Sequence, residues 1–212
     1  MRTGLRIRCR QFLKTEDGTA LVEFAIVLPI FLLLFFTLIE FGRMGGEYVM
    51  ADKAMQRAVR IAAVRPPVCP GVPGFNARGT VPVGTTPPKF GTACTAGNTV
   101  CTSPAPAVCT GVAGNPTVDE IWLAISPMLG PNATEQNLSF GYNYDPALNF
   151  LGGPYVPSVT VRLTGLSFQF AIPLGPLASL AGATGTLPPN SLPFPAMQMT
   201  LPGEDLDQGN NG

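Results

Sequence analysis

The sequence predicts an α+β protein. A long N-terminal helix crosses a membrane, projects beyond it, and packs on a second short helix and a small antiparallel sheet, with a disulfide-tied loop between them. Three observations predict this class: an apolar run at 19–39, a helical period continuing it to about residue 64, and alternating apolar patterns after residue 137. The expected organisation is a leader (1–18), a transmembrane helix (19–41), a projecting amphipathic helix (42–65), a Cys/Pro/Gly-rich loop (66–116), a helix with a small antiparallel sheet (117–203), and a flexible tail (204–212).

The apolar run is long enough to span a bilayer. As a helix, 19–39 measures about 31 Å, against a hydrocarbon core of ~30 Å. No Ala-x-Ala site follows it, so removal of the run as a signal peptide is not expected. Five basic residues precede it, and the positive-inside rule therefore places this end in the cytoplasm and exports the rest: Arg2, Arg6, Arg8, Arg10 and Lys14.

A carboxylate lies inside this run. Glu23 is the fifth residue after Gly18, and a charge at mid-bilayer costs roughly 2.5–3.5 kcal/mol on insertion scales, less near an edge. Another interaction must therefore offset the cost of placing this charge in the bilayer. One interpretation is a cleavage site between Gly18 and Thr19; the alternative is a plain signal anchor with a chance glycine and glutamate.

The helix continues past the membrane with one apolar face. Its apolar residues recur at three- and four-residue steps: Met44, Tyr48, Ala51, Met55, Ala58 and Ala62. Gly42, Gly45 and Gly46 mark its weakest point, which fits a hinge at the membrane edge, while the Gly-x-x-x-Gly spacing also permits close approach of another helix. Pro66 and Pro67 end the helix.

Four cysteines lie in the exported loop. Cys69, Cys94, Cys101 and Cys109 predict two disulfides in an oxidising compartment, with three pairings left open. Their spacings lack a Cys-x-x-Cys pair, which argues against a redox motif and weakly against zinc; zinc or free thiols are the alternatives.

The remainder of the chain predicts one helix and three strands. Thr117 to Glu120 has capping-box spacing, opening a helix over 118–129 whose Trp122 face should pack on the first helix. Alternation predicts strands around 138–142, 159–163 and 197–201, and a parity change after Gly165 predicts a bulge there. The acidic end from 203 is expected to fray.

Composition excludes several functions. The formal net charge is zero and histidine is absent, so nucleic acid is not an expected partner, and both His-based triads and His-containing zinc sites are excluded. We expect no catalytic residues, no metal and no cofactor. An anchored enzyme would have only scattered carboxylates to use: Asp119, Glu120, Glu135 and Asp145.

Several features in order resemble the TadE-like pseudopilins of tight-adherence pilus systems. They are Gly18 before Val22-Glu23-Phe24, Val27-Leu28-Pro29 in the span, Glu40-Phe41-Gly42-Arg43 at its exit, and the helix Ala54-Met55-Gln56-Arg57-Ala58. The later strand 159–173 and residues 197–204 are similar to the family's C-terminal end, whereas the Cys-bearing insert has no counterpart.

The resemblance implies a structural protein of the bacterial inner membrane, with a single span and an extracytoplasmic C-terminal region. A prepilin peptidase would cut after Gly18, and Glu23 would pair with the new ammonium on Thr19 of a neighbouring subunit. Other pilins or pseudopilins, the assembly platform and the lipid bilayer would be its partners in a pilus used for surface attachment. Thr19 departs from the family's usual phenylalanine, which leaves N-methylation open. The alternative function is an anchored extracytoplasmic ligand-binding module.

Overall fold

A computed structural model describes residues 17–204 and 206 of the chain. The described helices and strands are α2 (Asp17–Val64), β1 (Ala107–Thr110), α3 (Pro116–Ile125), β2 (Leu138–Tyr144), β3 (Pro157–Leu163), β4 (Ser167–Gln169), α4 (Leu174–Leu180), β5 (Ser191–Pro193) and β6 (Met197–Pro202). They form two compact units. One unit holds the described residues up to Gly45 with Phe168–Leu192, and the other holds Gly46–Ser167 with the described residues from Pro193 onward.

The larger unit is built on a four-stranded antiparallel sheet with the order β1-β2-β3-β6. Its register aligns Phe140 of β2 with Cys109 and Val161, and Val161 in turn with Met199. Because side chains alternate along each strand, these residues share one face of the sheet. The predicted α+β class and the strands around 138–142, 159–163 and 197–201 are confirmed.

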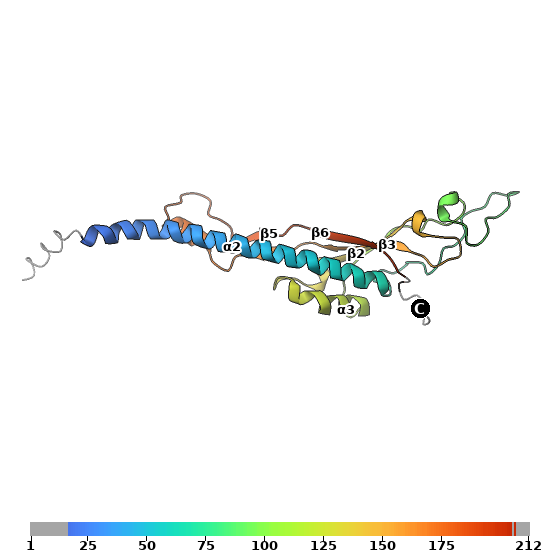
Figure 1. Ribbon diagram of the computed structural model, residues 1–212, viewed down its shortest axis with the longest axis horizontal. Coiled ribbons are helices and arrows are strands. Elements are labelled where there is room, and N and C mark those ends of the chain that lie inside the picture. The colour runs from blue at the N-terminus through green and yellow to red at the C-terminus, as the bar shows by residue number, and fades with distance from the viewer. Residues whose placement is uncertain (1–16, 205, 207–212) are drawn as a thin grey trace, which may run out of the picture. The chain divides into compact units, whose positions relative to one another are not determined.

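That sheet face packs on α3 and on the second half of α2, which lie side by side in Figure 1. The α2 residues in this core follow the predicted helical stripe and are mostly small: Ala51, Ala54, Met55, Ala58, Val59 and Ala62. Small side chains let the helix approach the sheet closely, while the volume is filled by larger residues from the strands and α3: Phe140, Tyr142, Val161, Ile121 and Ile125.

The predicted capping box at Thr117 was wrong. Asn115 caps α3, and its side chain accepts hydrogen bonds from the N–H groups of Thr117 and Val118. Pro116 occupies the first turn, where its missing N–H costs nothing. The Thr117 hydroxyl instead donates a hydrogen bond to the carbonyl of Pro66. Trp122 is half-buried at the edge of the core.

The predicted bulge at Gly165 was also wrong. β3 ends at Leu163, and Gly165 has a φ of +73°, a left-handed conformation that glycine adopts without strain. The chain turns there and begins a different two-stranded sheet, β4 with β5. The parity change therefore marks a change of sheet.

The loop predicted at 66–116 contains a strand, β1, which adds to the sheet edge beside β2. Two disulfides hold the loop: Cys69–Cys109 and Cys94–Cys101. The buried Asn76 joins it to the segment before β3, donating to Asn149 Oδ1 at 2.9 Å and to the carbonyl of Pro154 at 2.8 Å. The predicted disulfide-tied loop is confirmed.

The first residues of the predicted flexible tail are held against the larger unit. The backbone N–H of Glu204 donates to the carbonyl of Ala63 at 2.7 Å, and Leu206 is buried in the core. The rest of the predicted flexible tail, residues 205 and 207–212, lies outside the described residues.

The two disulfides should differ in their contribution to stability. The chain-entropy relation gives ~4 kcal/mol for the 40-residue separation of Cys69–Cys109 and ~2 kcal/mol for the 7-residue separation of Cys94–Cys101. We therefore expect Cys69→Ala/Cys109→Ala to lower the free energy of unfolding more than Cys94→Ala/Cys101→Ala. Urea unfolding of the full chain in detergent, followed by fluorescence of the single tryptophan, measures this. Equal costs, or the reverse order, would contradict it.

Candidate functional site

The predicted processing residues lie on the first turns of α2. The helix begins at Asp17, so Gly18, Thr19 and Glu23 share one continuous helix, and all three are exposed. Five residues of helix place Glu23 about 7.5 Å along the axis from Gly18. A Cβ added at Gly18 would meet nothing within 4 Å. The leader itself, with Cys9, falls almost entirely on residues 1–16, outside the described part of the chain.

Glu23 has no intramolecular partner among residues 17–204 and 206. No side chain or backbone group of that part of the chain forms a hydrogen bond or an ion pair with its carboxylate. An unpaired carboxylate is stable in water but unfavourable in an apolar medium. In lipid, a positive group from outside these residues would therefore stabilise the charged form of Glu23.

The first half of α2 exposes a large apolar surface. Its exposed large side chains are Leu21, Val22, Phe24, Ile26, Val27, Ile30, Phe31, Leu34, Phe35, Leu38 and Ile39. The helix is long and apolar enough, by length and composition, to cross a membrane, with a mean hydropathy of 2.7 over its most apolar window. An exposed apolar surface of this extent is unfavourable in water, because it leaves the hydrophobic effect unsatisfied.

A polar cluster that the sequence analysis did not predict lies at the end of this apolar stretch. Glu40 is only 1 % exposed, and its carboxylate accepts hydrogen bonds from the Ile172 backbone N–H and from Arg43, both at 2.9 Å. Arg43 also donates to the carbonyl of Gln169, and its guanidinium carbon lies 4.3 Å from the centre of the Phe168 ring. The buried charge is thus paired and hydrogen-bonded, the condition under which burial is tolerated.

The same unit covers one face of the apolar helix. Half-buried residues recur at three- and four-residue spacing on α2, ending at the fully buried Glu40: Leu28, Pro29, Leu32, Leu33, Phe36 and Thr37. Leu174 and Ala178 of α4 are buried in the same unit. The segment 168–192 therefore packs along the helix on the N-terminal side of Glu40.

Residues 18–63 match the TadE-like protein family. The predicted resemblance is confirmed over this segment, which we call the TadE-like segment. It includes Gly18, Glu23, Glu40 and the alanine stripe that packs on the sheet. Neither the curated proteins nor the solved structures give a match.

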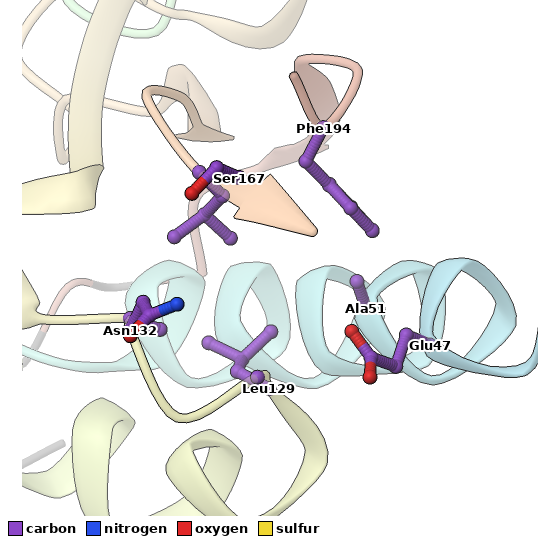
Figure 2. A pocket seen from close by; sticks show the side chains of 9 residues that line it. Glu47, Ala51, Leu129, Asn132, Ser167 and Phe194 are labelled. Atoms are coloured by element: carbon purple, nitrogen blue, oxygen red, sulfur yellow. The ribbon is translucent and has the colours of Figure 1, made fainter. Parts of the chain in front are cut away.

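Two small cavities lie in the larger unit. The first, about 20 Å³, lies between the second half of α2, the chain after α3 and the connections near Ser167 and Phe194, with Glu47 at its wall (Figure 2). The second, about 80 Å³, is lined by the loop residues Phe75 and Asn76 and by Tyr155. Small-molecule sites usually enclose roughly 300–1,000 Å³, so neither cavity has room for a ligand of that size.

Three of the four scattered carboxylates have local structural roles. Asp119 accepts from the Gly114 N–H, Asp145 accepts from the Ala147 N–H, and Glu120 pairs with Arg65 at 2.8 Å. The Arg65 hydrogen bonds hold the pKa of Glu120 below its usual value. The structure does not bring these groups together, and no cluster of His, Cys, Asp or Glu suited to a metal occurs among the described residues.

The Glu40 cluster should control local opening of the chain after β4. Replacing Glu40 with alanine removes the acceptor of the Ile172 N–H, a loss of about 1–3 kcal/mol for a buried hydrogen bond. We expect amide exchange at Ile172 to accelerate roughly 5- to 150-fold in Glu40→Ala. Glu40→Gln keeps an acceptor oxygen and should accelerate exchange less. Hydrogen exchange of the full chain in detergent measures both, and an unchanged rate in Glu40→Ala would contradict the assignment.

Proposed function

We propose that this chain is a membrane-anchored, TadE-like pseudopilin. A prepilin peptidase removes its leader after Gly18, and the mature protein has a structural role in assembling a tight-adherence pilus for surface attachment. The observation that carries the proposal is the match of residues 18–63 to TadE-like proteins, with Gly18 and Glu23 correctly spaced on one helix.

Cleavage at Gly18 would resolve the unfavourable position of Glu23. It creates an ammonium on Thr19, and the same group on a neighbouring subunit would meet the Glu23 carboxylate. Opposite charges attract strongly where the dielectric is low, whereas an unpaired charge there suffers desolvation. Glu23 lacks a partner within the described chain, so it is available for such a contact between subunits.

The proposed location is the bacterial inner membrane, with the N-terminus in the cytoplasm and the rest exported. The basic residues before the span favour this orientation. Two disulfides in the larger unit favour an oxidising compartment outside the cytoplasm.

The proposed work is packing and docking, with no catalysis by the chain itself. Its partners would be the prepilin peptidase, other pilins or pseudopilins, the assembly platform and lipid. The apolar surface of α2 suits helix packing inside an assembly as well as lipid.

Processing can be tested by mass spectrometry of protein extracted from its native membranes. We expect Thr19 at the N-terminus of the wild type and the intact leader in Gly18→Ala. A methyl group at Gly18 has free space in the structure, so a defect in this variant reports on the peptidase rather than on folding. A wild-type protein that retains Met1 in a strain with active prepilin peptidase would refute the cleavage.

The role of Glu23 can be separated from membrane insertion. Glu23→Gln removes the charge at nearly constant shape, so it should insert normally, yet pili should fall about tenfold or more if pairing contributes at least ~1.4 kcal/mol. Val27→Ala, one turn further along the exposed surface, is the matched control and should assemble normally. Membrane fractionation and pilus counts by electron microscopy measure the two effects. Normal piliation in Glu23→Gln would remove the assigned role.

A further inference from the structure

The segment 168–192 has the composition of a lipid-contacting element. Between Arg162 and Glu204 the chain carries no Asp, Glu, Lys or Arg. The helix α4 inside this segment buries Leu174 and Ala178 yet leaves Leu180 72 % exposed. Exposed apolar groups without nearby charges are typical of surfaces that bind membrane or protein.

The polar cluster fixes where this segment starts relative to the span. Glu40 directly follows the apolar run 19–39, and it binds the Ile172 N–H while Arg43 binds the Gln169 carbonyl and covers Phe168. If α2 crosses the bilayer as proposed, these contacts hold residues 168–172 at the C-terminal end of the span, which is the membrane surface.

In the structure, the segment belongs to the same unit as the α2 stripe that begins at Leu28, a helix face that the proposed anchor would present to lipid. Many of its amides are bonded internally: Phe170 donates to Asn190, Ala181 to Leu177, and Ala183 to Ala178.

Backbone hydrogen bonding limits how deep the segment can go in a bilayer. Leu28 lies twelve residues before Glu40, about 18 Å along the helix and well inside the hydrocarbon. Within the described chain, no group accepts hydrogen bonds from the N–H groups of residues 184–187, and each such group costs several kcal/mol in hydrocarbon. In lipid, the segment therefore cannot keep its full reach along α2, and the interfacial layer, where water is present, is the favourable depth.

We propose that residues 168–192 form a second membrane-contacting element, rooted by Glu40 and Arg43 and lying in the interfacial layer at the C-terminal end of the span. The exposed Leu180 of α4 contacts the upper acyl chains there. This inference rests on the proposed anchoring of α2. The proposed element would add a contact between the exported part of the chain and the bilayer.

Fluorescence quenching by brominated lipids tests the proposal. In a Cys9→Ser background, single probes are placed at Leu180→Cys in α4, Leu34→Cys in the span and Val83→Cys in the exported loop, all at exposed positions that tolerate a label. The purified full chain carries an environment-sensitive fluorophore in vesicles of phosphatidylethanolamine and phosphatidylglycerol. The bromines are placed either high or deep on the acyl chains.

We expect the Leu180→Cys probe to lose fluorescence mainly with high bromines, the Leu34→Cys probe mainly with deep ones, and the Val83→Cys probe with neither. A Leu180→Cys probe that behaves like Val83→Cys, or that is quenched best by deep bromines, overturns the interfacial placement while leaving the anchor intact. Absence of quenching at Leu34→Cys overturns the anchor and this inference together. Purified protein in vesicles contains no pilus partner, so quenching at Leu180→Cys reports contact with lipid rather than with another protein.

Discussion

One continuous helix must satisfy two different surroundings, and the rest of the structure depends on how it does so. The first half of α2 exposes many large apolar side chains, while the second half buries a narrow stripe of alanines and Met55 against a sheet. Both halves are stabilised by apolar contact: the sheet supplies it to the second half, and lipid would supply it to the first half under the proposed anchoring. The residues from Glu40 to Gly46 separate these two halves of α2.

The charges on this helix are placed according to that division. Glu40 lies at the boundary and is fully partnered by Arg43 and the Ile172 backbone, so it needs nothing from outside the chain. Glu23 lies inside the apolar half and has no partner within the described residues. The first carboxylate therefore organises contacts within its own chain, whereas under the proposed function the second would pair with a neighbouring subunit. This contrast links the geometry to the proposed role in assembly.

Much of this could be predicted from the sequence, where periodicity is long and local. The extent of α2, the strands β2, β3 and β6, and the disulfide-tied loop follow from patterns that burial imposes directly on residue order. The features that were wrongly predicted or not predicted depend on contacts between distant residues or on competition between neighbouring residues for the same role. Asn115 replaced Thr117 as the cap because Pro116 fits the first turn, and β1 is only four residues long with one buried face. The Glu40 cluster could not be predicted, because its partners at 168–172 lie far along the chain.

The most direct test of the account is a scan of spin labels along α2 in lipid vesicles, comparing access to oxygen and to a water-soluble nickel complex. The account predicts that the nickel complex is excluded at every position from 24 to 39. From 47 onward, its access should rise and fall with a period of about 3.6 residues as the helix packs on the sheet. Periodic nickel access within 24–39 would contradict it, because that half of the helix would then lie in water on one side.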